Sequence, residues 1–177
     1  VTDGTNSVRV DDVWDYYYFP ETGQALSGVA GVMTYTYSDA KLEPRLARDV
    51  VEADGAPVRL QRVQQVLYSD LIKSVEDGES DISYMYDETV TIEGIVTMPS
   101  GLSYAGAGVK FIFADVHGGP WSAILSYDPD SAAFPTLFEG DLIQATGYIS
   151  EYSTGPANMT ELFITEPINI IDFEQPL

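Results

Sequence analysis

The sequence predicts an all-β protein: a small closed or partly open β-barrel, accompanied by a second, incomplete β module. Three observations predict this fold class. Most segments alternate apolar and polar residues with a period of two, glycines and prolines interrupt them at short intervals, and a C-terminal stretch recurs weakly near the N-terminus. We place the incomplete module at residues 1–56 and the barrel at residues 57–177.

The weak repeat sets the domain organisation. Residues 119–128 and 137–152 are echoed, in the same order, by residues 5–13 and 20–35, and the echo has one more residue between its glycines. We also set the pair Glu43–Pro44 against Glu166–Pro167. Residues 68–118 have no counterpart ahead of Val1, so the first module contains only the second half of the repeat. Half a barrel leaves open sheet edges and an uncovered apolar face, so either another copy or a missing part of the parent chain must complete it.

Four segments ahead of residue 89 are predicted in order. Residues 8–13 open a strand, and residues 25–37 form a long one, in which Gly28 and Gly31 indicate a bulge or a sharp bend. Residues 58–67 are ambiguous between helical and strand spacing; we expect a strand there, followed by a loop or one short helix. The acidic residues 76–88 are expected to form a solvated surface loop.

The C-terminal part carries the clearest strands. Residues 89–98 alternate cleanly as far as Gly94, and Gly147 marks a bend in a long strand. Strands of this length, bent near their centres by glycine, are typical of a small closed barrel. The further strands are expected at residues 109–116, 121–127, 141–152, 162–165 and 168–173.

Five runs of this part resemble the OB-fold modules of secreted bacterial proteins, which are found beside extracellular nucleases and in cell-surface proteins. The runs are residues 89–97, 109–115, 120–128, 139–152 and 158–162. The resemblance covers residues 58–173, and its C-terminal half recurs at residues 5–50. It implies an OB-like β-barrel. We find no nuclease segment in this sequence.

Charge and composition limit the partners. Eight basic residues against 28 acidic ones give a net charge of −20, which repels polyanions and makes a nucleic-acid partner unlikely. The absence of cysteine excludes disulfides and thiolate metal sites. We expect no membrane partner, because no apolar run is long enough to span a bilayer. An acidic, tyrosine-rich β protein of this kind indicates an extracellular or cell-surface location. Calcium is the one cofactor considered, since hard oxygen ligands are abundant, but residues 52–55 lack the spacing of a calcium loop.

The sequence does not predict an enzyme. His117 is the only histidine, and it lies in Asp115–Pro120, which is typical of a hairpin turn. Asp128 and Asp130 also lie in a predicted turn, where a pair of carboxylates is more often structural than catalytic. We therefore expect no catalytic and no metal-binding residues.

Two functions remain. In the first, the protein is a non-catalytic extracellular structural protein that self-assembles head-to-tail into a fibre or surface layer, because strands from a neighbouring copy complete the half module. The aromatic run at residues 16–19 offers a large contact area to such a partner, or packs on the chain's own second module. The predicted self-assembly interface consists of Val8, Val10, Trp14, Tyr16, Tyr17, Tyr18, Phe19, Val29, Val32 and Tyr35.

In the second, the chain is an accessory binding module of a larger secreted protein, with a nucleic-acid or glycan ligand. Alternation puts Phe111 and Phe113 on one strand face, where a place in the core competes with a role as a stacking platform. Trp121 is expected to begin a strand, where it would plug the end of the barrel. The candidate ligand-binding residues are Lys110, Phe111, Phe113, Trp121 and Tyr127.

Overall fold

The computed structural model describes residues 1–177 except 15, 17, 66–81 and 154–157. The chain divides into two units, Val1–Ala56 (unit 1) and Pro57–Leu177 (unit 2), which we describe separately. Strands dominate both units, so the all-β prediction is confirmed.

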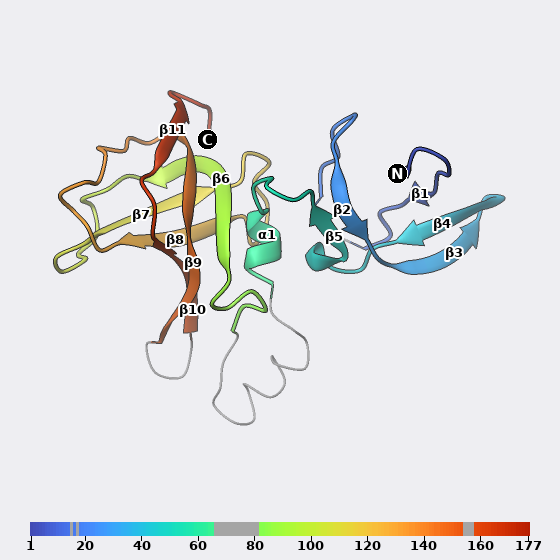
Figure 1. Ribbon diagram of the computed structural model, residues 1–177, viewed down its shortest axis with the longest axis horizontal. Helices are drawn as coiled ribbons and strands as arrows, with labels where there is room; N and C mark the ends of the chain where they lie inside the picture. The colour runs from blue at the N-terminus through green and yellow to red at the C-terminus, as the bar shows by residue number, and fades with distance from the viewer. Residues whose placement is uncertain (15, 17, 66–81, 154–157) are drawn as a thin grey trace. The chain divides into compact units, whose positions relative to one another are not determined.

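Five strands of unit 2 close into a ring. Neighbours pair in the order β6–β7–β8–β10–β9, and β9 returns to β6; every pairing is antiparallel except the parallel pair β8–β10. A five-stranded barrel of this kind is an OB-like barrel, as the sequence predicts. The ring runs in Figure 1 from the green β6 to the orange-red β10. Its strands are β6 (Thr89–Met98), β7 (Val109–Ala114), β8 (Ala123–Asp128), β9 (Leu142–Ser153) and β10 (Asn158–Ile164), and β11 (Asn169–Asp172) pairs with the start of β9.

The core of unit 2 fills this ring. Alternate residues of β6, β7 and β9 point inward, as the period of two predicts, and Phe111 and Phe113 are 0% exposed. The core consists of Leu60, Val63, Met85, Val90, Ile92, Val96, Phe111, Phe113, Ile124, Leu137, Ile143, Ala145, Ile149, Leu162 and Ile164.

The strand expected at residues 58–67 is wrong. The chain forms a short helix, α1 (Leu60–Val63), there. The three-residue spacing of Leu60 and Val63 puts both side chains on one face of a helical turn, and both join the core. Residues 66–81, including part of the predicted acidic loop, lie outside the described residues.

Unit 1 consists of one sheet and one separate strand pair. The sheet has the order β1–β4–β3, with β1 parallel to β4 and β3 antiparallel to it, while β2 and β5 form an antiparallel pair. The elements are β1 (Arg9–Val10), β2 (Leu26–Val29), β3 (Val32–Thr36), β4 (Asp39–Glu43), the 3₁₀ turn η1 (Ala47–Asp49) and β5 (Val50–Glu52).

These pairings repeat those of β8–β11. The parallel pair β1–β4 corresponds to β8–β10, and the antiparallel pair β3–β4 corresponds to the second half of β9 with β10. The pair β2–β5 corresponds to the first half of β9 with β11. The pairings of unit 1 therefore match those of the second half of the unit 2 barrel. Among the described residues, no strand of unit 1 corresponds to β6 or β7.

Glycines fix the residue-level match between the two units. At Gly147 a Cβ would overlap the carbonyl oxygen of Phe163, and at Gly31 a Cβ would overlap that of Glu43, so both strand crossings require glycine. The extra residue of the echo is absorbed by a bulge in β2, where the pairing with β5 shifts. The register pairs Val32 with Glu43 and Tyr148 with Phe163, so Glu43 matches Phe163. Our match of Glu43–Pro44 with Glu166–Pro167 is therefore wrong by three residues.

Several strand boundaries differ from the prediction. The long strand expected at residues 25–37 is two strands, β2 and β3, which lie in different sheets. The turn before β4, Tyr37–Ser38, has positive φ at both residues (52° and 67°). Such turns usually contain glycine or asparagine, and since neither is present here, the sequence carries no sign of the hairpin and we did not predict β4. The strand expected at residues 8–13 is confined to Arg9–Val10.

Candidate functional site: the open half module

The apolar side of the unit 1 sheet is open. Val10 lies beside Leu42, and Leu42 lies beside Met33, so all three share one face. In unit 2 the matching row is Ser126–Leu162–Ile149, and each of its members is 0% exposed inside the barrel. Met33, by contrast, is 59% exposed and Tyr35, on the same face, is 74% exposed. We call this surface the inner face: Val8, Val10, Leu26, Val29, Met33, Tyr35 and Leu42.

The opposite side of the sheet is closed by polar pairs. Lys41 and Glu43 are both buried there. Lys41 forms an ion pair with Asp11, and its hydrogen bond holds the pKa of the Asp11 carboxyl below its usual value. The Thr34 hydroxyl donates a hydrogen bond of 2.8 Å to Glu43. Unit 1 thus buries Lys41 and Glu43 on one side of its sheet and leaves Met33 and Tyr35 exposed on the other, where the remaining members of the inner face are half-buried.

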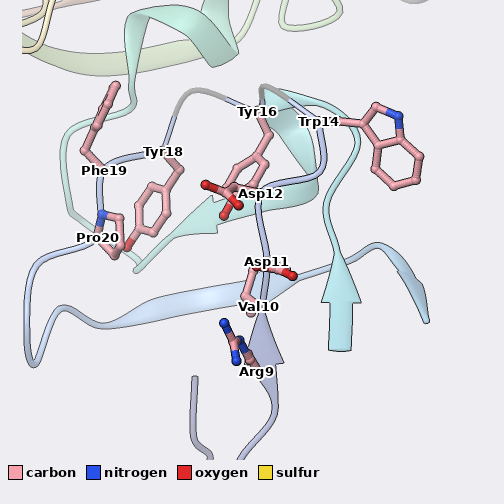
Figure 2. A pocket seen from close by; sticks show the side chains of 9 residues that line it. All are labelled: Arg9, Val10, Asp11, Asp12, Trp14, Tyr16, Tyr18, Phe19 and Pro20. Atoms are coloured by element: carbon pink, nitrogen blue, oxygen red, sulfur yellow. The ribbon is translucent and has the colours of Figure 1, made fainter. Parts of the chain in front are cut away.

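A cavity of about 550 Å³ lies next to this sheet, as Figure 2 shows. Tyr16 is buried at its wall, and this burial, with nearby Asp12, raises the pKa of the Tyr16 phenol. The Tyr18 hydroxyl donates to Gln24 Oε1 at 2.8 Å, which holds the second ring in place. The cavity is lined by Arg9, Val10, Asp11, Asp12, Trp14, Tyr16, Tyr18, Phe19 and Pro20.

The structure separates the predicted interface residues into three groups. Val8, Val10, Val29 and Tyr35 lie on the inner face, and Trp14, Tyr16, Tyr18 and Phe19 lie around the cavity. Val32 lies on the opposite face from Met33, so it is not part of the inner face. Tyr17 lies outside the described residues.

Sequence reasoning missed Met33 and Leu42. Leu42 belongs to β4, which was not predicted. Met33 had a usable signal: it lies two residues after Gly31, as the buried Ile149 lies two residues after Gly147.

The second candidate set, on unit 2, is divided by the barrel wall. Phe111 and Phe113 lie in the core and are therefore unable to offer a ring to a ligand. Trp121 is 56% exposed with φ +64° in the turn before β8, so it neither begins a strand nor plugs the barrel. Lys110 and Tyr127 point outward and line one groove, which we call the aromatic groove: Tyr104, Ala105, Gly106, Lys110, Tyr127, Tyr152, Glu161 and Phe163.

Glu161 is the buried carboxyl of this groove. Burial raises its pKa above 4.5, and Lys110 opposes that shift. The folded state therefore favours protonated Glu161, so ionisation at higher pH costs stability. We expect Glu161→Gln to stabilise unit 2 against urea at about pH 8, and the gain to shrink towards about pH 5. Exposed Glu139→Gln is the control and gives no such pH-dependent gain. A constant difference across this range would contradict the assignment.

The described residues contain no group of three or more His, Cys, Asp or Glu side chains placed to hold a metal ion. The expectation of no cofactor, with calcium as the one candidate, stays a prediction. His117 lies in the β7–β8 turn, where its backbone N–H donates to Asp115 Oδ1 at 2.8 Å, so the hairpin turn predicted there is confirmed. No helix in the described part of the chain is long and apolar enough to span a membrane.

No protein-family model matches this chain, and no curated protein matches it. Among solved structures, one similar chain is "OBody AM1L10 bound to hen egg-white lysozyme". The two sequences are 21% identical, the TM-score is 0.37, and the match covers 50% of this chain and 83% of the other.

Proposed function

We propose that this protein is a non-catalytic extracellular or cell-surface structural protein that self-assembles, with strands from a neighbouring copy completing its open half module. One observation carries the proposal. Unit 1 reproduces the strand pairing of β8–β11, yet Met33, whose counterpart Ile149 is fully buried in unit 2, is 59% exposed in unit 1.

The strand directions of unit 1 suit such a contact. Since β1 is parallel to β4 and β3 is antiparallel to β4, β1 and β3 run in opposite directions. When the free edge of β3 lies beside β1 of the next copy, the two strands pair antiparallel. In the complete barrel, β6 pairs antiparallel with the first half of β9, which corresponds to β2 rather than to β3. Unpaired strand edges are templates for pairing of this kind.

The contact is head-to-tail. The edges of β1 and β3 are different surfaces, so each copy offers one edge to the copy before it and the other edge to the copy after it. A heterologous contact of this kind propagates into an open assembly unless its rotation closes a ring. Successive half modules then continue one curved sheet with the inner faces turned inward.

Apolar burial supplies the driving force. Burying a large apolar side chain contributes about 1.5–3 kcal/mol, and Met33 and Tyr35 are the most exposed members of the inner face. Trp14 and Phe19, which are 43% and 48% exposed beside the cavity, offer further aromatic contact area to a neighbouring copy. The opposite side of the sheet, where Lys41 and Glu43 are buried, takes no part in the contact.

Salt is expected to strengthen the assembly. Each copy carries a net charge of −20, so copies repel one another at low ionic strength. Raising the ionic strength from about 0.01 M to about 1 M shortens the Debye length from about 30 Å to about 3 Å and removes most of this repulsion. Light scattering over a concentration series at each salt level measures the mean mass. We expect growth at lower protein concentration in high salt, and a monomer at every concentration and salt level would disprove the proposed function.

A further inference from the structure

The aromatic groove of unit 2 takes no part in the proposed assembly, and its chemistry points to a separate role. Its cavity of about 390 Å³ lies within the size range of small-molecule sites. Side chains from β7, β8, β9 and β10 line it together with the loop that follows β6, so the barrel wall itself fixes most of its shape.

The ring surfaces of the groove are held in place. Tyr127 meets Phe163 edge-on at a centroid distance of 5.4 Å, and Phe163 stacks on Tyr148 at 4.8 Å. A side chain at Gly108 would overlap the Tyr127 ring, so glycine leaves room for that ring. A fixed ring costs little conformational entropy when a ligand packs on it. Tyr104, which is 91% exposed, and Tyr152 extend the aromatic surface.

Glu161 is the feature that calls for a ligand. Glu161 is only 7% exposed, yet it lines the groove. Within the part of the chain that the structure describes, no donor contributes a hydrogen bond to its carboxyl; burial and the Lys110 charge are the influences on it. Since Glu161 lines the groove, a ligand hydroxyl that donates to its carboxyl binds with a charge-assisted hydrogen bond.

Lys110 and the overall charge restrict the kind of ligand. The Lys110 ammonium lies 5.0 Å from the centroid of the Tyr152 ring, so the protein itself already supplies the cation for this ring. A polyanion would be repelled by the buried Glu161 and by the net charge of −20. The ligand class that fits the groove is therefore uncharged, carries hydroxyls that both donate and accept hydrogen bonds, and presents apolar C–H faces to the rings.

We propose that the aromatic groove binds a neutral oligosaccharide. Pyranose C–H faces pack on Tyr127 and Phe163, one sugar hydroxyl donates to Glu161, and Lys110 donates to a sugar oxygen. This activity goes beyond the proposed assembly and does not depend on it, because every residue of the groove belongs to unit 2.

Chemical-shift titration of the full, isotope-labelled chain tests this proposal. The neutral probes are cellohexaose, maltohexaose, xylohexaose, mannohexaose and chitohexaose, and the anionic probes are hexagalacturonate and hexathymidylate. We expect saturable shifts at the groove with at least one neutral probe and none with the anionic probes. We expect Glu161→Gln and Tyr127→Ala each to weaken that binding by about tenfold or more. The first variant weakens a hydrogen bond to the ligand, and the second removes a ring contact.

Trp121→Ala is the matched control, since it removes an exposed aromatic ring of the same unit outside the groove. We expect it to leave the affinity unchanged. Glu161→Gln is close to isosteric, so it keeps the test valid if Tyr127→Ala fails to fold. Shifts with no neutral probe, stronger binding of an anionic probe, or full affinity in both groove variants would each overturn the proposal.

Discussion

Met33→Lys is expected to keep the protein monomeric at concentrations where the unaltered chain assembles. The ammonium would stand in the centre of the inner face, where the matching Ile149 of unit 2 is fully buried. Burying an unpaired charge there costs several kcal/mol. A loss of roughly 3 kcal/mol is enough to weaken the contact about a hundredfold. Since Met33 is 59% exposed within one copy, the fold of unit 1 tolerates the change. Light scattering over a concentration series measures the effect.

Val32→Lys is the control for this experiment. It adds the same charge to the same strand one residue away, but on the opposite face, and Val32 is 44% exposed. We expect it to assemble like the unaltered chain. Assembly by Met33→Lys, or equal loss in both variants, would show that the inner face is not the contact.

Gly147→Ala is expected to destabilise unit 2 by about 3 kcal/mol or more, through overpacking against a backbone that has no room to move. The new methyl group would overlap the carbonyl oxygen of Phe163, at the point where β9 passes from β6 to β10. Gly31→Ala is expected to disrupt unit 1 in the same way, because its methyl group meets the carbonyl oxygen of Glu43. Urea unfolding followed by tryptophan fluorescence and amide signals reports on each unit.

Gly28→Ala is the matched control, since a Cβ there meets nothing within 4 Å. It lies in β2 and is expected to leave unit 1 folded. If Gly31→Ala folded as well as Gly28→Ala, the correspondence of Gly31 with Gly147 would be wrong, and the half-barrel description of unit 1 would lose its main support.

The barrel was predictable from the sequence because its strands carry strong local patterns. Residues 89–98 alternate cleanly, and the structure has a strand over the same ten residues. Local pattern failed where tertiary contacts decide the structure. The helix at Leu60–Val63 forms because both side chains reach the core, and the Tyr37–Ser38 turn adopts positive φ without the residues that usually favour it.

The open site was predictable in outline and less so in detail. The repeat alone matched residues 5–35 to the second half of the barrel module. Which side chains face its open side depends on register, and a shift of one residue exchanges the two faces of a strand. Val32 was therefore assigned to the interface in place of its neighbour Met33, which the register with Leu42 puts on the inner face.

Hydrogen exchange measured across a concentration series tests most directly whether the half module is completed by another copy. Amides of β1 and β3 lie on strands that have a free edge in one copy, whereas β7 is paired on both sides. We predict that exchange in β1 and β3 slows by about tenfold or more as the protein assembles, while exchange in β7 stays unchanged. Assembly that leaves β1 and β3 exchanging as in the monomer would contradict the account.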